Sequence, residues 1–375
     1  KPIQDNPFPP DRDDLRWSVF KNYAADEMFE TVDKKVFPFI QTMRDEDSTY
    51  AHFMKDARLA IPNAAMLVKV VDLLDKIEMQ DLDTKGDIYE YMLAKIASSG
   101  QNGQFRTPRH IIKLMVEMMA PEVGDTIVDP ASGTCGFLVA ATEYMREHHA
   151  DEINSGPGAK HFHHNMFHGF DFDNTMLRIG SMNMALHGVN GANILYQDSL
   201  SKSIKENFPE QEENFFDVVL ANPPFSLSNW GADTWAADPR SFCGVPPAKN
   251  GDYAWIQHMI CSMRDKTGRV GVVMPHGVLF RGGAEAKIRE CLIREDRLEA
   301  VIGLPPNLFY STSIPACLLI FKNTKDAARK DHVLFVDGSA RFVKGKNQNV
   351  MSEDDMNAVL AAYQTGEDPD GDDGV

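Results

Sequence analysis

Cysteine patterns that bind metal or build disulfide frameworks are missing from this sequence of 375 residues. Its five cysteines are odd in number, stand far apart and form no C-x-x-C pair, so neither a disulfide framework nor a zinc site is predicted. A reducing compartment, the cytoplasm, fits this pattern best. Histidines gather at His161, His163, His164 and His168 with no cysteine nearby, and we interpret them as part of a solvated loop that holds no metal.

Long apolar runs and a surplus of positive charge are missing as well. No apolar segment approaches the ~20 residues that cross a bilayer, and we find no leader segment, so no membrane association is predicted. The 38 Lys and Arg residues are outnumbered by 55 Asp and Glu residues, which gives a formal net charge of -17. A protein that grips DNA unaided usually has a basic face, so a DNA substrate would need to be held by another chain.

The length of the chain allows two domains with cores of their own, and the apolar pattern changes between them. The first part contains segments of helical period, such as 64–77, and no recognisable chemistry. A further helix is predicted over 88–97, and Ser98-Ser99-Gly100 follows it as a stop and linker. The predicted division is a helical N-terminal domain at 1–97, an α/β domain at 98–350, and the start of a C-terminal helix with an acidic tail at 351–375.

Short apolar strands alternate with amphipathic helices from Thr107 onward, which predicts a parallel sheet with crossover helices. The predicted strands are 126–128, 166–170, 193–196, 217–220, 269–274, 298–302, 316–321 and 333–336. The predicted helices are 108–120, 137–148, 175–187, 253–263, 284–293 and 352–363. A stretch rich in Gly and Pro, 226–251, has no clean period and is predicted to be a long functional loop, in which Trp230 and Trp235 either stack on bases or are buried.

A glycine turn, 129–136, follows the first predicted strand and opens a helix. Gly133 and Gly136 let the backbone approach a ligand, and the first helical turn offers free N–H groups. No lysine follows as in a phosphate-binding P-loop, and the dinucleotide fingerprint G-x-G-x-x-G is incomplete. An acid at a strand tip beside a glycine turn suits a nucleoside such as S-adenosylmethionine, whose ammonium group Asp129 would face. A tight turn without a ligand is the alternative.

Two further aspartates follow predicted strands. Asp171 comes after 166–170, and Asp198 comes after 193–196. Open α/β sheets bind ligands at the carboxyl ends of their parallel strands. A carboxylate in the position of Asp171 can accept hydrogen bonds from two ribose hydroxyls, and Asp198 can accept one from an adenine amino group. Helix capping and turn formation are the alternative roles of these aspartates.

The most informative segment is Asn222-Pro223-Pro224-Phe225, just after the strand 217–220. Its two prolines stiffen the chain where it leaves the sheet. An amino nitrogen on an aromatic ring is a poor nucleophile because its lone pair is delocalised, and two hydrogen-bond acceptors would favour its pyramidal form. The Asn222 side-chain oxygen and the Pro223 carbonyl can supply them, while Phe225 stacks on an extruded base. A rigid strand exit without chemistry is the alternative, and it leaves both prolines unexplained.

This segment matches the N-P-P-[YF] motif of amino-group methyltransferases, and the wider sequence resembles the modification subunit of type I restriction–modification enzymes. Further segments that resemble this family are 103–109, 129–136, 251–255 and 303–309. The resemblance implies a Rossmann-like methyltransferase catalytic domain at 98–350 that uses S-adenosylmethionine. It implies these cofactor-binding residues: Gln104, Phe105, Thr107, Pro108, Asp129, Ala131, Ser132, Gly133, Gly136, Asp171, Asp198 and Asn222.

The function that the resemblance implies is site-specific methylation of adenine N6 in DNA, with Asn222, Pro223, Pro224 and Phe225 as the catalytic residues. DNA would be bound through a specificity subunit, in a hetero-oligomer that also contains restriction subunits with endonuclease and translocase activity. Two alternatives remain open. An N-P-P-Y-like motif also serves methylation of a glutamine amide in proteins, and the chain could instead be a non-catalytic subunit that binds S-adenosylmethionine and supports assembly.

Overall fold

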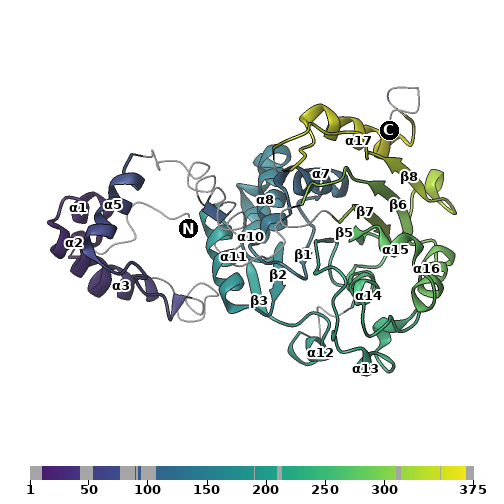
Figure 1. The fold of residues 1–375 in the computed structure, drawn as a ribbon, viewed down its shortest axis with the longest axis horizontal. Helices are drawn as coiled ribbons and strands as arrows, with labels where there is room; N and C mark the ends of the chain where they lie inside the picture. Colours follow the sequence, from purple (N-terminus) through teal and green to yellow (C-terminus); the bar gives the residue numbers. More distant parts are fainter. Residues whose placement is uncertain are drawn as a thin grey trace.

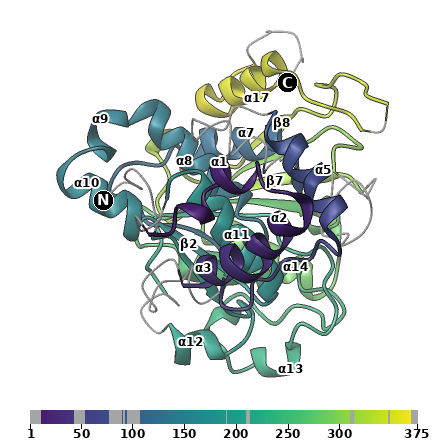
Figure 2. The ribbon, with the colours of Figure 1, turned by 90° about the vertical axis from the view of Figure 1, so that its left-hand side faces the viewer.

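The computed structural model describes residues 11–42, 54–76, 89, 92–93, 107–189, 191–208, 213–309, 314–346 and 348–368. A small group of N-terminal helices stands beside a larger α/β body (Figure 1). Figure 2 shows the same helices gathered on the side of the body where α11 lies. On the side of α11, the Tyr89 hydroxyl donates a hydrogen bond to the Ile179 carbonyl at 3.2 Å.

The N-terminal helices have a core of their own. Their bounds are η1 Asp13–Leu15, α1 Trp17–Phe20, α2 Ala25–Thr31, the π-helix η2 Val32–Val36, α3 Phe37–Gln41 and α5 Ala64–Leu74. Phe20, Met28 and Leu67 are buried in this cluster. The helix predicted over 64–77 is confirmed as α5, and Asn63 caps it by accepting from the Met66 N–H at 2.9 Å. Of the helix predicted over 88–97 only three residues are described, and the linker at 98–100 lies outside the described residues, so the domain division stays a prediction.

An eight-stranded sheet forms the larger body, with the order β3-β2-β1-β4-β5-β7-β6-β8. Its strands are β1 Ile127–Asp129, β2 Phe167–Asp171, β3 Asn193–Tyr196, β4 Val218–Ala221, β5 Arg269–Pro275, β6 Leu298–Gly303, β7 Ala316–Lys322 and β8 Leu334–Asp337. These positions confirm the predicted strands to within a residue or so at each end. The prediction of an all-parallel sheet is wrong for β7, which runs antiparallel to both β5 and β6. The described residues between β6 and β7 contain no crossover helix, and a parallel return requires one.

Helices cover both faces of the sheet (Figure 1). The longer ones are α7 Arg109–Met119, α8 Gly136–His148, α10 Gly156–His164, α11 Asn174–Leu186, α14 Asp252–Ser262, α16 Ala284–Arg294 and α17 Glu353–Thr365. The shorter ones are α9 Ala150–Ile153, α12 Ser203–Asn207, α13 Ala232–Trp235, η3 Pro239–Ser241, α15 Gly277–Phe280 and η4 Ala327–Arg329. In both views α17 lies at the top of the molecule and α12 and α13 lie at the bottom (Figures 1 and 2).

Strand β4 illustrates why the sheet is buried on both faces. Val218 and Leu220 pack in the core that includes α7, α8 and α17, whereas Val219 and Ala221 pack in the core that includes α14 and α16. Successive strand residues point to opposite faces, so a strand covered on both sides must be apolar throughout. The same requirement explains why the sequence shows short continuous apolar runs here.

The histidine-rich segment is not a loop, contrary to the prediction. His161, His163 and His164 lie at the end of α10, and His168 lies in β2. The ring of His161 makes a hydrogen bond with the Asp125 carbonyl at 2.7 Å. Within the described ranges, no three His, Cys, Asp or Glu side chains are grouped so that they could hold a metal ion. None of the described helices combines the length and the apolarity that a membrane span requires.

Candidate active site

Asp129 ends β1 and is buried, with one carboxylate oxygen accepting from the Ala131 N–H at 3.0 Å. Burial raises the pKa of Asp129 to about 8, and the charge of Asp171 adds to the rise, while the Ala131 hydrogen bond opposes it. It has no ion-pair partner among the described residues, so a cationic ligand would relieve the cost of its charge. This carboxylate therefore fits the ammonium-bearing cofactor predicted from the sequence.

Asp171 ends β2 and holds the glycine turn in place. One of its carboxylate oxygens accepts from the Gly133 N–H at 3.0 Å and the other from the Asp173 N–H at 2.9 Å. Gly133 has a φ of 47°, and a Cβ atom there would meet nothing within 4 Å, so the turn offers open space beside the backbone. Asp171 and the glycine turn, which the sequence analysis treated separately, thus form one structural unit.

Gly136 has a packing role, and its predicted role in cofactor binding stays a prediction. A Cβ atom at Gly136 would lie 3.1 Å from Ile112 Cδ1, so glycine lets α8 pack closely against α7. Pro108 is the N-cap residue of α7. Ala131 and Ser132 lie in the same turn as Gly133, where Ser132 is buried and its N–H donates to the Phe170 carbonyl at 2.9 Å. Gln104 and Phe105 lie outside the described residues.

The turn after β3 is exposed at Asp198, whose side chain accepts from the Leu200 N–H at 3.0 Å. Asp198 therefore stabilises its own turn, which is the alternative role predicted for it. The turn is attached to the glycine turn because the Ser199 hydroxyl donates to the Pro130 carbonyl at 2.6 Å. The loops after β1, β2 and β3 consequently meet at one edge of the sheet.

Asn222 follows β4, and its Nδ2 donates to the Thr107 Oγ1 at 2.8 Å. Its Oδ1 is shielded from solvent and has no hydrogen-bond partner among the described residues. Buried acceptors without a partner are rare in native proteins, and each one calls for an explanation. Pro223 is buried, Pro224 is exposed, and the ring of Phe225 lies 6.3 Å from the ring of Phe309 in a T-shaped arrangement. The segment 303–309, which also resembles the family, therefore contacts the Asn222-Pro223-Pro224-Phe225 segment.

Asp252 was missed as a site residue, although the sequence analysis noted its segment, 251–255. One of its carboxylate oxygens accepts from the Ser226 N–H at 2.7 Å, directly after Phe225, and the other accepts from the Arg281 guanidinium. The same guanidinium binds Glu285. The backbone that leaves the Asn222-Pro223-Pro224-Phe225 segment is thus fixed by a buried carboxylate. No sequence pattern would have paired residues 26 positions apart.

Arg240 was also missed, and it is fully buried in the loop 226–251. Its guanidinium binds Asp238 at 2.8 Å and donates to the Ser199 carbonyl at 2.8 Å and the Ser201 carbonyl at 3.1 Å. It stacks over Trp235, 4.8 Å from the ring centre. The long loop is therefore attached to the turn that carries Asp198.

The two tryptophans of this loop are buried, which confirms one of the two alternatives. Their rings lie 5.2 Å apart in a T-shaped arrangement, and the Trp235 Nε1 donates to the Leu200 carbonyl at 3.0 Å. The loop also contains α13 and η3 rather than irregular backbone alone. Trp230 and Trp235 are therefore packing residues that keep the loop folded over the core.

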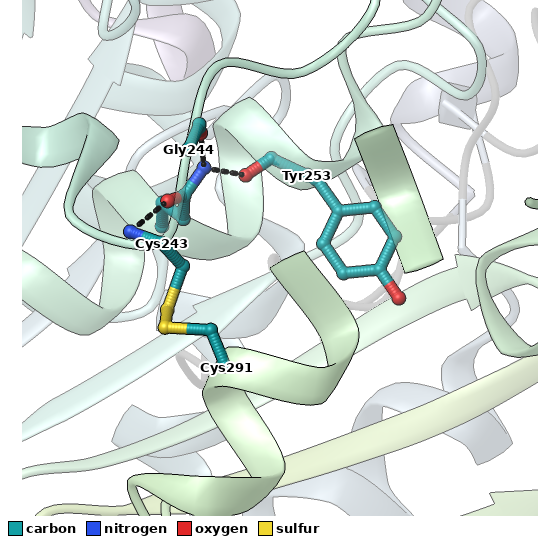
Figure 3. The surroundings of a disulfide bond; sticks show 5 residues. Cys243, Gly244, Tyr253 and Cys291 are labelled. Atoms are coloured by element: carbon teal, nitrogen blue, oxygen red, sulfur yellow. Dashed lines mark hydrogen bonds between the residues drawn. A yellow bond between two sulfur atoms is a disulfide. The ribbon is translucent and has the colours of Figure 1, made fainter. Parts of the chain in front are cut away.

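A disulfide joins Cys243 of the loop to Cys291 of α16, contrary to the prediction from the number and spacing of the cysteines. The two cysteines are 48 residues apart, and only the packing of the loop on α16 brings their Cα atoms to 5.6 Å. Figure 3 shows the bond beside Gly244 and Tyr253. The Gln257 side chain accepts from the Cys243 N–H at 3.0 Å and donates to the Gly244 carbonyl at 3.0 Å, which fixes the backbone around the bond.

The order of these features along the sheet is that of Rossmann-like methyltransferases. A glycine turn follows β1, acids follow β2 and β3, and the Asn222 segment follows β4. The chain belongs to the N-6 DNA methylase family, whose sequence profile matches residues 80–372. The family resemblance and the fold class predicted from the sequence are thereby confirmed.

Individual relatives point to one kind of protein. The chain is 30% identical over 317 residues to the methylase subunit of the type I restriction enzyme MjaVII from Methanocaldococcus jannaschii, covering 81% of this chain and 52% of the relative. It is 31% identical over 290 residues to the methylase subunit of the type I restriction enzyme HindI from Haemophilus influenzae, covering 76% of this chain and 61% of the relative. The chain thus spans about half to three-fifths of the length of these relatives.

A solved structure shows the same arrangement over most of the chain. It is the methyltransferase subunit of a type I restriction–modification system from Streptococcus thermophilus, with a TM-score of 0.76 and 29% sequence identity. The superposition covers 95% of this chain and 75% of that chain. The N-terminal helices and the α/β body are thus both part of the shared structure.

Proposed function

We propose that this chain carries the catalytic centre of an S-adenosylmethionine-dependent methyltransferase that modifies adenine N6 in DNA. The observation that carries the proposal is the Asn222 Oδ1, a buried acceptor with no partner among the described residues, at the carboxyl end of β4. An unmade hydrogen bond of this kind costs about 1–3 kcal/mol, and a target amino group would satisfy it. Membership of the N-6 DNA methylase family supports adenine as the base.

The proposed cofactor site uses the loops after β1, β2 and β3. Asp129 would face the cationic end of the cofactor, because a cation would stabilise the ionised form of this buried carboxyl group, which has no cationic partner among the described residues. Asp171 would accept from the ribose hydroxyls while still holding Gly133, since each carboxylate oxygen has a second lone pair. Asp198 would accept from the adenine amino group of the cofactor. S-adenosylmethionine would supply the methyl group as the electrophile.

The chain's own residues would prepare the target nitrogen. Asn222 Oδ1 and the Pro223 carbonyl would accept its two N–H groups, which favours the pyramidal nitrogen with an available lone pair. Phe225, whose ring contacts Phe309 edge to face, would stack on the extruded base. Asp252 would keep the exit of this segment in place through the Ser226 N–H. Positioning of this kind supplies a large part of the acceleration in group-transfer enzymes.

The proposed partner is a specificity subunit that holds DNA, in a larger assembly with restriction subunits. The strongly acidic composition supports this division, because a net charge of -17 opposes unaided binding to a polyanion. One structural neighbour is described by its role in complex assembly of a type I restriction–modification system, although its 23% identity carries only the fold. We also propose a cytoplasmic location, where chromosomal DNA and S-adenosylmethionine are both present.

The decisive variant is Asn222→Ala in the chain co-purified with the product of a neighbouring specificity gene. Methyl transfer to DNA should fall by at least about 10²-fold, because a transition-state contact is removed, while cofactor binding measured by calorimetry should change little. Mapping of N6-methyladenine in the host genome would identify the modified motif. Retained activity in the variant would reject the assigned role of Asn222, and methylated glutamine in a protein, without modified DNA, would reject the adenine assignment.

A further inference from the structure

We infer that Thr107 is a positioning residue that orients the side-chain amide of Asn222 for methyl transfer. The family resemblance implies a cofactor-binding role for Thr107, and its hydroxyl oxygen accepts a 2.8 Å hydrogen bond from the Asn222 Nδ2. The two residues are 115 positions apart, on the segment before α7 and on the exit of β4. The inference rests on the proposed function, because it concerns how the proposed acceptor is presented.

An asparagine amide presents an acceptor on one side and two donors on the other. A half-turn about its Cβ–Cγ bond exchanges them with almost no change in shape. Only the oxygen can accept a hydrogen bond from a target amino group. The amide NH₂ group would face another donor and could make no hydrogen bond with it. An acceptor beside the NH₂ group satisfies the Asn222 Nδ2 while Oδ1 faces the target amino group, and Thr107 Oγ1 is in that place.

The surroundings of both residues are rigid, which makes this choice effective. Thr107 is only 7% exposed and leads directly into α7, whose Ile111 and Leu114 are buried in the core. Two prolines follow Asn222 and restrict its backbone. With both backbones restricted, rotation about the Asn222 Cβ–Cγ bond is the motion that exchanges the oxygen and the NH₂ group. The unpartnered state of Asn222 Oδ1 among the described residues is what the proposed orientation produces.

The opposite orientation has a cost that the observed one avoids. If the Thr107 hydroxyl donated to Oδ1 instead, the Asn222 Nδ2 would lose its acceptor and would point its hydrogens at the target. A hydroxyl at position 107 can hold either orientation, but only acceptance from Nδ2 leaves the oxygen for catalysis. Removing the hydroxyl should therefore lower the fraction of molecules with a competent amide, without removing any group that touches the target.

The test uses Thr107→Val, which keeps the shape of the side chain and removes the hydroxyl, and Thr107→Ser, which keeps the hydroxyl. Both are measured in the complex with the specificity subunit. We expect kcat to fall roughly 10-fold to 100-fold for Thr107→Val, with the Kd for S-adenosylmethionine and the KM for DNA within about 3-fold of the wild type. Thr107→Ser should recover kcat to within about 3-fold. Thr107→Ala should match Thr107→Val, so a folding defect specific to valine would be recognised.

The matched control is Thr142→Val, because the Thr142 hydroxyl is also buried and donates to the Leu138 carbonyl at 2.9 Å, inside α8. This variant should keep wild-type kcat. A normal kcat in Thr107→Val, or a serine variant as slow as the valine variant, would overturn the inference. So would a loss of cofactor affinity equal to the loss of kcat, because Thr107 would then be a cofactor ligand. A wild-type complex that methylates no DNA would instead overturn the proposed function.

Discussion

The Asp129 side chain is buried and has no cationic partner among the described residues. Burial, together with the nearby charge of Asp171, raises its pKa from 3.8 to about 8. Above pH 3.8 the unfolded chain has lost this proton, whereas the folded chain retains it up to about pH 8. The folded state thus binds more protons in this window, so the free energy of unfolding falls as the pH rises through it. A binding site for a cationic ligand is expected to show this fall in the free energy of unfolding when the ligand is absent.

Asp129→Asn should therefore stabilise the cofactor-free protein at alkaline pH. The amide keeps an oxygen to accept from the Ala131 N–H but never carries the buried charge. We expect its advantage in Tm over the wild type to grow between pH 5 and pH 8, at a limiting rate of roughly 1.4 kcal/mol of unfolding free energy per pH unit. Thermal melts at several pH values measure this, and affinity for S-adenosylmethionine should drop by at least about 10-fold. Melting curves that stay parallel with pH would contradict the assigned burial.

The loop 226–251 acts as one element because buried polar contacts join it to its neighbours. Arg240 binds Asp238 and the carbonyls that follow β3, Asp252 binds the Ser226 N–H, and Cys243 is bonded to Cys291. These contacts tie the exit of β4 to the turn that carries Asp198 and to α16. A loop of this length without such anchors would lose its shape, and the positions of Phe225 and Asp198 would become independent of each other.

Arg240→Met tests this coupling. It leaves Asp238 as a buried carboxylate without its cation, and breaking a buried pair in this way costs about 3–5 kcal/mol. We expect denaturant unfolding to show that loss, together with weaker cofactor binding through the loosened turn at Asp198. Arg294→Met is the control, because its ion pair with Glu290 is exposed on α16 and should contribute less than about 1 kcal/mol. Equal stabilities of the two variants would show that Arg240 does not anchor the loop.

At the scale of the whole molecule, the negative net charge of the chain opposes binding to the proposed substrate, DNA, which is also negatively charged. Basic residues that would ordinarily meet phosphate are in part used internally: Lys322 lies 3.0 Å from Glu299, Lys325 binds Asp296, and Arg329 donates to the Tyr363 carbonyl. The last of these contacts fastens α17 to the rest of the body. With a net charge of -17, the chain needs a partner that supplies the positive charge for binding DNA.

The isolated chain should fail to retard a DNA duplex in a gel at ~0.15 M salt, where steering by distant charges is screened. The complex with the specificity subunit should bind, with an affinity that falls steeply as salt rises because counterions are released. Fluorescence anisotropy with a labelled duplex gives both results. Tight binding by the chain alone would contradict the proposed division of labour, and the lysine and arginine residues responsible would then need to be located.

Much of the fold could be predicted because its signals are local. The apolar runs at β1 to β8 and the helical periods of α7, α8, α14 and α17 depend on residues close together in the chain, and the boundaries agree closely. Asp129, Asp171 and Asp198 could be proposed as site residues for the same reason, since each stands at or just after the end of a recognisable strand. Local signals also misled, as in α10, where the histidines were expected to lie in a loop.

The sequence by itself thus determined the alternation of strands and helices, the family motif at Asn222 and the edge of the sheet where the site would form. Only the tertiary structure decided the direction of β7, the bond between Cys243 and Cys291, and the partner of Asn222. Each of these depends on which distant segments pack side by side. Local periodicity does not show which distant segments will pack together. That pairing is set when the elements of the chain bury both faces of the sheet.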